Sequence, residues 1–336
     1  MPGDRYIEDE DNSVKVDIEV EGQTGEVDFD TLKSGGIIKQ RQKNQFTVRL
    51  KCPGGRVPLE RIEKAAEVAR QYGGDYVHLS YRQSVEIPYV NTGDLDAVKE
   101  DLAEVGQEIA SCGPRVRVPT ACSGCEYNPN GLMDTQSQAL DICEKFFGEG
   151  DLVHKFKISF SGCPIDCSRT NEMDLGFQGA VDPEWDQDSC IGCEICAEAC
   201  PEGAIEADEE TGEPVYYPHR CLYCAECIRA CPTGAWMEEK RGWIVRVGGK
   251  HGRHPRHGQA IAAFLPDQKV EEVVAAILSW YEENGRGQGR TRISTLLLDD
   301  ETWEKFLRDI RPVLGEWAID DPLQPRANEI HNMPLP

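Results

Sequence analysis

Hydrophobic and polar residues follow two periods along the first third of the chain. Phe46–Leu50 alternates in the manner of a strand, and Tyr76–Leu79 and Ser84–Ile87 follow the same pattern. Apolar residues recur at helical spacing from Pro58 to Tyr72 and again from Leu95 to Ala110. The pattern predicts a strand–helix–strand–strand–helix module of the α+β class.

A second module follows, and a cysteine-rich segment of about residues 184–240 interrupts it. Its expected strands are Val116–Val118, Lys155–Phe160 and Gly242–Val247, and its expected helices are Thr135–Phe147, Gln268–Glu282 and Asp300–Ile310. Residues 1–34 are acidic and weakly patterned, which predicts an extended or partly ordered arm. The chain is long enough for two or three domains, each with its own core.

The charge balance narrows the function. The 336 residues include 60 acidic and 36 basic side chains, a net charge of −24, which argues against a general nucleic-acid binder. No apolar stretch has the length needed to span a bilayer, and the acidic N-terminal segment has no signal-peptide pattern. Cysteines spaced for metal binding fit a reducing compartment, so we expect a soluble, cytoplasmic protein.

Two copies of one cysteine pattern carry the strongest signal. Each copy reads Cys-x-x-Cys-x-x-Cys-x-x-x-Cys-Pro, the run that holds a pair of [4Fe–4S] clusters in bacterial ferredoxins, with each fourth cysteine crossing to the other cluster. The predicted ligand sets are Cys190, Cys193, Cys196 and Cys231 for one cluster, and Cys221, Cys224, Cys227 and Cys200 for the other. A zinc site is the alternative, but zinc closes at four ligands and does not explain the duplication or both Cys-Pro endings.

Seven of the fifteen cysteines lie outside these runs. Cys122 and Cys125 follow one expected strand, and Cys163 and Cys167 follow another, in the segment Ser161-Gly162-Cys163-Pro164-Ile165-Asp166-Cys167. The remaining cysteines are Cys52, Cys112 and Cys143, which we expect to be small buried side chains.

With these two groups the chain resembles the sirohaem-containing sulfite and nitrite reductases. The resemblance covers most of the chain and implies a [4Fe–4S] cluster held by Cys122, Cys163 and Cys167, with Cys167 also bridging to the sirohaem iron. The family has a further cysteine where this chain has Asn128. Either Cys125 supplies that sulfur, or the fourth ligand is not a cysteine, or the site is degenerate.

The resemblance also implies a domain organisation. Residues 1–34 would be the arm and 35–111 the ferredoxin-like half domain, which includes Arg82-Gln83-Ser84-Val85-Glu86. Residues 112–183 and 241–336 would form the sirohaem/[4Fe–4S] α/β domain, and 184–240 an inserted bacterial-type 2[4Fe–4S] ferredoxin domain. The insert is similar to that of dissimilatory sulfite reductases and of the C subunit of anaerobic sulfite reductase.

Basic residues stand out in so acidic a chain, and the resemblance gives them roles. Sulfite is an anion and sirohaem carries carboxylates, so both need fixed cations. The expected substrate-binding and proton-donating residues are Arg82, Arg117, Lys155 and Lys157. The expected contacts to cofactor carboxylates are Arg41, Lys43, Arg49, Lys51, Arg115, Lys250 and Arg253. Lys155 and Lys157 are two apart on an expected strand and would share a face; for each residue the alternative is an ordinary surface charge.

The function implied is the six-electron reduction of sulfite to sulfide, with sirohaem and three [4Fe–4S] clusters as cofactors. Expected partners are a ferredoxin or electron-input subunit and a second reductase subunit, identical or different, because only one family repeat is present. Nitrite is the alternative substrate. Two further hypotheses are an electron-transfer subunit with a decayed sirohaem site and a catalyst with a modified tetrapyrrole.

Overall fold

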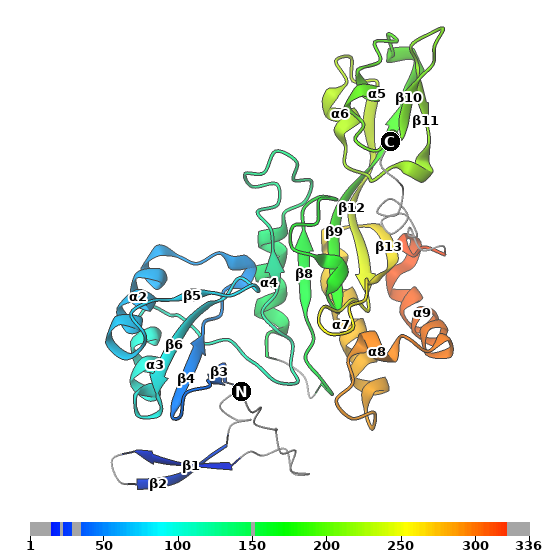
Figure 1. Cartoon of the computed structure of the whole chain (residues 1–336). Coiled ribbons are helices and arrows are strands. Elements are labelled where there is room, and N and C mark those ends of the chain that lie inside the picture. Colours follow the sequence, from blue (N-terminus) through cyan, green and yellow to red (C-terminus); the bar gives the residue numbers. More distant parts are fainter. Residues whose placement is uncertain (1–14, 21–22, 29–34, 149–151, 321–336) are drawn as a thin grey trace, which may run out of the picture. The chain divides into compact units, whose positions relative to one another are not determined.

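The computed structural model describes residues 15–20, 23–28, 35–148 and 152–320, and these divide into two compact units. The first unit comprises described residues of Met1–Val118 and Phe146–Lys155, and the second comprises those of Pro119–Lys145 and Phe156–Pro336. Figure 1 labels the helices and strands of both units. The predicted arm begins outside the described residues, but Lys15–Val20 (β1) and Gln23–Asp28 (β2) form an antiparallel hairpin within it.

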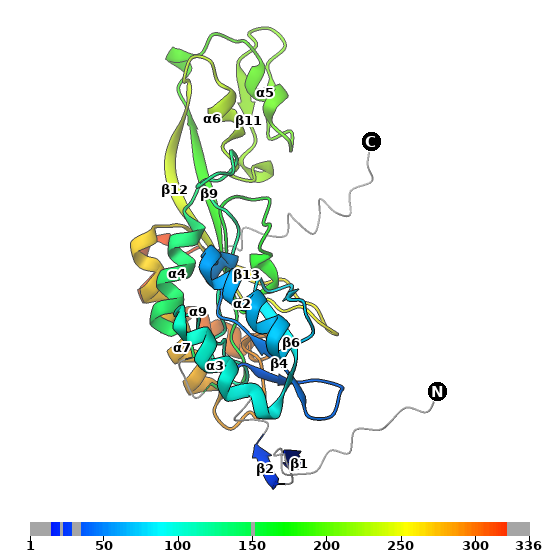
Figure 2. The same cartoon turned by 90° about the vertical axis from the view of Figure 1, so that its left-hand side faces the viewer.

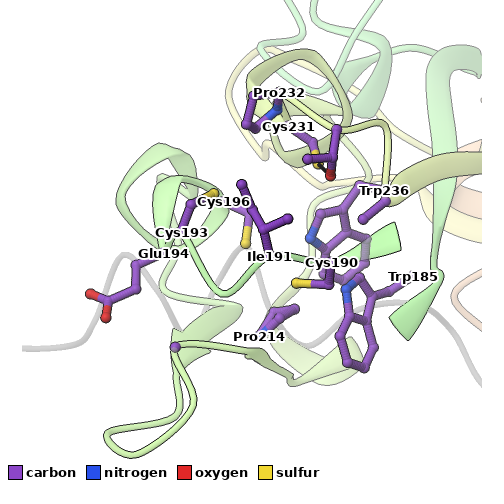
Figure 3. Close-up of a pocket in the computed structure, with 13 residues that line it drawn as sticks. Trp185, Cys190, Ile191, Cys193, Glu194, Cys196, Pro214, Cys231, Pro232 and Trp236 are labelled. Atoms are coloured by element: carbon purple, nitrogen blue, oxygen red, sulfur yellow. Dashed lines mark hydrogen bonds between the residues drawn. The ribbon is translucent and has the colours of Figure 1, made fainter. Parts of the chain in front are cut away.

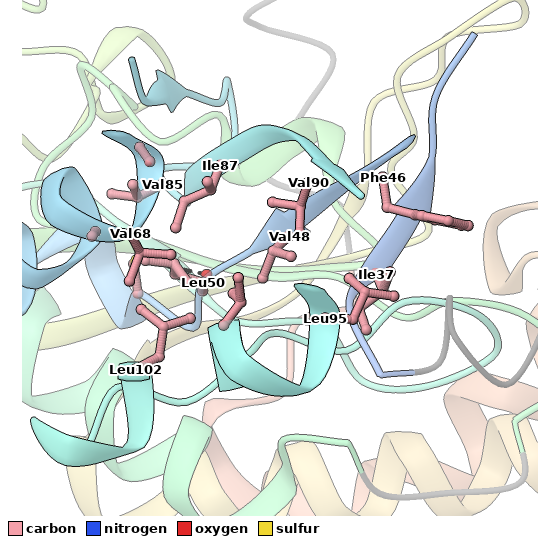
Figure 4. Close-up of a cluster of buried hydrophobic side chains, with 14 residues drawn as sticks. Ile37, Phe46, Val48, Leu50, Val68, Val85, Ile87, Val90, Leu95 and Leu102 are labelled. Carbon is pink, nitrogen blue, oxygen red and sulfur yellow. Dashed lines mark hydrogen bonds between the residues drawn. The ribbon is translucent and has the colours of Figure 1, made fainter. Parts of the chain in front are cut away.

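The first unit contains an antiparallel sheet of order β3-β4-β6-β5 covered by two helices. Its elements are β3 (Ile37–Lys39), β4 (Gln45–Arg49), α2 (Leu59–Tyr72), β5 (His78–Leu79), β6 (Val85–Asn91) and α3 (Leu95–Glu104). Alternate residues of β4, among them Phe46 and Val48, point inward and meet Val68 of α2 and Leu102 of α3 in one core (Figure 4). The predicted strand–helix–strand–strand–helix order is present, and the structure adds one strand that was not predicted, β3, ahead of it. The predicted half domain is therefore stabilised mainly by apolar burial between one sheet face and two helices.

Helix α3 ends at Glu104 and not at the expected Ala110. Gly106 has φ +64, its N–H donates to Ala103 O at 2.9 Å, and the Gln107 N–H donates to Leu102 O at 2.9 Å. These two bonds form a Schellman cap, which uses a left-handed glycine to satisfy the last carbonyls of a helix. The hydrophobic periodicity that continues beyond Glu104 belongs to an extended segment.

The second unit is built on a mixed sheet of order β13-β12-β9-β8-β7. Its strands are β7 (Thr120–Ala121), β8 (Ile158–Ser161), β9 (Leu175–Trp185), β12 (Trp236–Val247) and β13 (Gln259–Leu265); its helices are α4 (Thr135–Phe146), α7 (Asp267–Gly285), α8 (Ile293–Leu296) and α9 (Asp300–Leu314). The β7, β8 and β9 pairings are parallel, whereas β9 with β12 and β12 with β13 are antiparallel. Phe160 of β8 stacks on Phe177 of β9 at 4.9 Å, and Trp243 of β12 meets Phe160 edge-on at 5.7 Å, which fixes the three strands to one core.

The prediction of a strand at Val116–Val118, in the first unit, was wrong, and the strand predicted at Lys155–Phe160 is present but begins later. Val116–Val118 is not a strand, because the Val116 carbonyl accepts from Gly148 and the Val118 carbonyl accepts from Arg82 instead of from a neighbouring strand. Strand β8 begins at Ile158, so Lys155 and Lys157 precede it. Strand geometry therefore does not place the two lysines on a shared face.

The cysteine-rich segment lies at the far end of a long hairpin. Strands β9 and β12 pair from Leu175↔Val247 to Trp185↔Trp236, and the chain between them folds into α5 (Ile195–Ala199), β10 (Ile205–Ala207), β11 (Pro214–Tyr216) and α6 (Glu226–Ala230) (Figure 2). We call residues 186–235 the hairpin insert. Both strands cross the predicted domain boundaries without a break.

Candidate functional site

One cavity in the hairpin insert gathers cysteines from both runs. Cys231 of the second run lies beside the first three cysteines of the first run, and the indoles of Trp185 and Trp236 close the same space (Figure 3). The four cysteines around this space are Cys190, Cys193, Cys196 and Cys231. We call it the Trp236 cavity.

A second cavity shows the reciprocal exchange. Cys200 of the first run lies with the first three cysteines of the second run, and Tyr216 and Pro183 line the same space. Its four cysteines are Cys200, Cys221, Cys224 and Cys227. We call it the Tyr216 cavity. The two sets of cysteines are those that the crossed ferredoxin pattern groups together, and the clusters themselves stay a prediction.

The backbone repeats along with the cysteines. The second residue after the first cysteine and the first residue after the second cysteine are left-handed in both runs, at Gly192 and Glu194 and again at Tyr223 and Ala225, with φ between +61 and +63. Each loop then enters a five-residue helix, α5 or α6, which ends at the fourth cysteine and its proline. The turn lets three sulfurs point to one side, and it directs backbone N–H groups toward them: Tyr223 N–H donates to Cys221 Sγ at 3.2 Å.

Buried donors test whether these cavities fit an iron–sulfur cluster. Among the described residues, Trp185 Nε1 is a buried side-chain donor without a hydrogen-bond partner, whereas the Trp236 indole and the Tyr216 hydroxyl interact with the Cys196 and Cys221 thiols. All three residues line one of the two cavities. Unpaired buried donors are costly, and cluster sulfides accept hydrogen bonds from such groups. In the same described part of the chain no three His, Cys, Asp or Glu side chains are placed to hold a single metal ion. A four-iron cube instead attaches each thiolate to a different iron, so its ligands surround a space.

The cysteines that line these two cavities have shifted pKa values. Burial raises the pKa of Cys227 to about 12, and burial also raises the pKa of Cys196, Cys221 and Cys224. Cys231 is the exception: burial acts to raise its pKa, but N–H groups including that of Trp236 and the Thr233 hydroxyl bring it to about 7. Thiolates are the metal-binding form, so filling either cavity must release protons.

A third cysteine group lies where β8 ends. Cys122, after β7, accepts N–H hydrogen bonds at its Sγ from Gly124 at 3.3 Å and from Gly162 at 3.1 Å. Cys163 is buried, and burial raises its pKa; charge on Cys122 and Cys167 raises it further, whereas Arg229 acts to lower it. We call Cys122, Cys163 and Cys167 the β8 cysteine group. The parallel β7–β8 pairing brings together residues that are about forty positions apart in sequence.

The loop from Gly162 to Thr170 is held close to the sheet. A Cβ on Gly179 of β9 would lie 2.4 Å from the Gly162 carbonyl oxygen, so only glycine allows this approach. Asp166 is left-handed, and its carboxylate accepts the Thr170 N–H at 2.8 Å. This bend exposes Cys167 while Cys163 stays buried, an arrangement in which one thiolate is accessible to a second cofactor.

The fourth position of this group remains a prediction. Cys125 is exposed, its N–H donates to Met133 O at 3.0 Å, and its charge adds to that of Glu238 in raising the pKa of Arg241. Asn128 uses its side-chain oxygen to accept the Asn130 N–H at 3.0 Å, so it closes a turn in the same loop. Cys52, Cys112 and Cys143 are buried, as expected.

In the first unit, four of the predicted anion-binding residues have partners within the unit. Arg49 forms an ion pair with Glu86 at 2.6 Å, and Lys51 forms one with Glu108 at 2.7 Å. Arg82 donates to the Val118 carbonyl at 2.7 Å, and Arg117 donates to Cys112 Sγ at 3.1 Å. Of the remaining four, Arg41, Lys43 and Arg115 are exposed and Lys155 is half-buried.

In the second unit the glycine-rich loop of residues 248–258 is more ordered than its composition suggests. Lys250 and Arg256 pair through their backbones, and Lys250 Nζ lies 3.5 Å from Thr295 Oγ1. Arg253 is exposed, and the Lys157 N–H donates to the buried carboxylate of Asp174. The roles of Lys157, Lys250 and Arg253 toward an anion remain predictions.

Sequence reasoning missed several residues of this region. Arg246 lies on β12 with 6% of its surface exposed, burial lowers its pKa to about 10, and its Nη1 has no partner among the described residues. Trp236 and Tyr216 were also missed, as was Arg229. Trp236 could have been found, because a large aromatic residue five positions after the last cysteine is visible in the sequence. No local sequence signal indicates that Arg246 is buried, because a charged residue in a strand usually points to solvent.

Family comparison agrees with this geometry. Residues 112–316 match the nitrite and sulphite reductase 4Fe-4S domain, and residues 38–105 match the nitrite/sulfite reductase ferredoxin-like half domain. The chain belongs to the nitrite and sulfite reductase family. The first match includes the β8 cysteine group and the hairpin insert.

Individual relatives place the chain within this family. It is 34% identical over 285 residues to the coenzyme F420-dependent sulfite reductase of Methanocaldococcus jannaschii, a match that covers 84% of this chain but 45% of that protein. It is 29% identical over 275 residues to the C subunit of the anaerobic sulfite reductase of Salmonella typhimurium, covering 74% of this chain and 80% of that one. The fold is also that of dissimilatory sulfite reductase I, with a TM-score of 0.65 at 20% identity over 83% of this chain and 72% of the other.

No helix in the described part of the chain combines the length and apolar character needed to cross a bilayer. The cytoplasmic location stays a prediction.

Proposed function

We propose that this protein is the sirohaem-binding chain of a sulfite reductase, which reduces sulfite to sulfide with six electrons. The observation that carries the proposal is the β8 cysteine group: Cys122, Cys163 and Cys167 come together at the end of β8 inside the matched 4Fe-4S domain. Two similar proteins are named sulfite reductases, which favours sulfite as the substrate.

The donor set fits the cofactors that this function needs. Cys122 and Cys163 would hold a [4Fe–4S] cluster with Cys125 as the proposed fourth ligand, and Cys167 would be shared between that cluster and the sirohaem iron. When bound, sirohaem supplies an iron that takes up the substrate and passes electrons to it. The hairpin insert would hold two further clusters, one in the Trp236 cavity and one in the Tyr216 cavity, for three in total.

The protein's own contribution is binding and charge. The buried N–H groups of Gly124 and Gly162 donate to Cys122 Sγ and orient it. Basic side chains, proposed to be Arg82, Arg117, Lys155 and Lys157, would bind the sulfite oxygens and supply the protons that convert departing oxygen to water. Arg41, Lys43, Arg49, Lys51, Arg115, Lys250 and Arg253 are proposed for cofactor carboxylates. Since Arg49 and Lys51 already pair with glutamates, their binding would require those ion pairs to be shared or exchanged.

The proposal includes partners. A ferredoxin or an electron-input subunit would supply low-potential electrons to the hairpin insert, and a second reductase subunit would complete the assembly. The chain spans about half the length of the F420-dependent relative.

Nitrite is the second candidate substrate, because the matched family model describes nitrite and sulphite reductases together. The deciding experiment is anaerobic turnover of the purified protein with reduced methyl viologen, with sulfite or nitrite as substrate and with sulfide and ammonia as measured products. A higher kcat/KM for sulfite, with sulfide formed, supports the proposal. Preference for nitrite would change the assigned substrate, and no turnover of either would leave an electron-transfer subunit.

A further inference from the structure

Cys112 lies in the extended segment that follows α3, and the backbone of the first unit fixes this segment. The Ala110 N–H donates to the Arg49 carbonyl at 2.8 Å, and the Lys51 N–H donates to the Glu108 carbonyl at 2.9 Å. Cys112 comes two residues after Ala110, and 4% of its surface is exposed. Main-chain pairing with the end of β4 therefore places this buried thiol beside Arg49.

Two arginine side chains donate hydrogen bonds to the sulfur of Cys112. Arg117 Nη1 lies 3.1 Å from Sγ, and Arg49 Nη1 lies 3.4 Å from the same atom. Sulfur is a weak acceptor, so two guanidinium donors on one buried thiol go beyond the space-filling expected of a small core side chain. Both arginines are among the cations that the proposed function assigns to anions, Arg117 to the substrate and Arg49 to the cofactor carboxylates.

The two arginines are held in different ways. Glu86 of β6 is the cross-strand neighbour of Arg49, and its carboxylate contacts the Arg49 guanidinium at 2.6 and 2.7 Å. Arg117 Nη1 is shared between the Cys112 sulfur and the Ser111 carbonyl, which lies at 3.3 Å. Cys112 therefore connects an arginine anchored by a carboxylate to an arginine proposed to bind the substrate.

A short turn brings Arg117 back to Cys112. Gly113 has φ +87, a backbone conformation that glycine adopts without strain. The Ser111 hydroxyl donates to the Val116 carbonyl at 3.4 Å and closes the turn. Since the turn has its own hydrogen bond, we expect a change of the Cys112 side chain to affect the Arg117 guanidinium more than the path of the chain.

Resting on the proposed function, we infer that Cys112 is a positioning residue for sulfite binding: its sulfur holds the Arg117 guanidinium, and the Arg49–Glu86 pair braces that sulfur. Cys112 itself does not touch the substrate. An arginine that is already held loses less side-chain freedom when it binds an anion, so the anion binds more tightly. This gain is the same for the bound substrate and for the transition state, so it acts on KM and not on kcat.

The test is a double-mutant cycle on Cys112 and Arg117 in the fully loaded protein. Steady-state sulfide formation with reduced methyl viologen gives KM and kcat, and calorimetric titration of the oxidised protein with sulfite gives Kd without turnover. The variants are Cys112→Ala, Arg117→Gln and the double variant. Cys52→Ala is the matched control, because Cys52 is a buried thiol of the same unit whose Sγ donates to the Leu50 carbonyl at 3.6 Å.

We expect Cys112→Ala to raise KM and Kd for sulfite on the order of tenfold, the loss of a hydrogen bond to a charged group, and to change kcat less than about twofold. Cys112→Ser, whose hydroxyl still accepts, should stay within about threefold of the wild type. In the Arg117→Gln background, Cys112→Ala should have no further effect on KM. Cys52→Ala should lower the melting temperature and leave KM unchanged.

Independent, multiplying effects of the two replacements on KM would overturn the inference, as would an equal rise of KM in Cys52→Ala, because the thiol would then act through core packing. If Cys112→Ala does not fold, Cys112→Val, which fills the space without an acceptor, takes its place in the cycle. A wild-type protein that forms no sulfide from sulfite would instead overturn the proposed function, and the inference with it.

Discussion

The hairpin insert and the β8 cysteine group bind the same kind of metal centre in this account, but they are built differently. In the insert, two runs of eleven residues each surround two cavities with four cysteines apiece. The β8 group draws Cys122 from one loop and Cys163 and Cys167 from another, and its fourth position departs from the family pattern at Asn128. A site made by local turns is specified by spacing, whereas a site made by a sheet depends on distant packing.

The difference explains what the sequence could predict. Crossed cysteine sets in the insert followed from spacing, because the same left-handed positions recur in both runs. Both helices and three of the four sheet strands of the first unit followed from periodicity. The end of α3 at Glu104 and the start of β8 at Ile158 did not, because backbone hydrogen bonds and not hydrophobicity decide them. The burial of Arg246 could not be predicted, since it depends on neighbours that only the folded chain supplies.

The largest expected effect is on sulfite turnover, and it distinguishes a residue needed for catalysis from one needed for electron supply. Cys167→Ser should reduce sulfite turnover to background with any donor, because the thiolate shared with the haem iron is lost. Cys193→Ser, in the exposed loop of the Trp236 cavity, should keep turnover with a small artificial reductant that can bypass the insert. Steady-state sulfide formation with reduced methyl viologen measures both. Normal turnover by Cys167→Ser would contradict the assignment of that cysteine.

The second prediction concerns the stability of the second unit's sheet, on which the β8 cysteine group depends and the hairpin insert does not. Asp174, at the start of β9, is fully buried and pairs with Arg292 at 2.6 Å. Arg292→Gln would leave a buried carboxylate without its cation, which costs about 3–5 kcal/mol. Urea unfolding followed by circular dichroism should show this loss. Arg286→Gln, which breaks an exposed pair with Glu282, is the matched control and should change the free energy of unfolding by less than about 1 kcal/mol. Similar values for the two variants would refute the buried-pair argument.

A third prediction tests whether Cys125 is the fourth ligand of the cluster at the β8 cysteine group. If Cys125 completes the β8 cluster, Cys125→Ala should yield protein that lacks about four irons, the content of one cluster. Cys143→Ala removes a buried thiol on α4 and should leave the iron content unchanged while lowering stability by about 1 kcal/mol. Iron analysis of both variants decides the point, and full iron content in Cys125→Ala would assign the fourth position to another group.

The smallest effect is a pH dependence of cluster assembly. Thiols must lose their protons to bind iron, and the pKa of Cys227 is raised to about 12, so below that value its contribution to affinity grows as pH rises. Cys231, with a pKa of about 7, contributes such a dependence only below neutral pH. The apparent affinity of the metal-free protein for its clusters should therefore be higher at pH 8 than at pH 6. It should rise by about tenfold per pH unit for each thiol that is still protonated. Assembly independent of pH would contradict the burial effect on these thiols.

We propose that one chain holds a sirohaem-coupled cluster together with two clusters in the hairpin insert. Quantification of iron, acid-labile sulfide and extracted tetrapyrrole per chain in anaerobically purified protein decides this. We expect about twelve cluster irons, from three four-iron clusters, with one sirohaem and its iron in addition. About eight cluster irons with no tetrapyrrole would contradict it, because the hairpin insert alone would then be occupied.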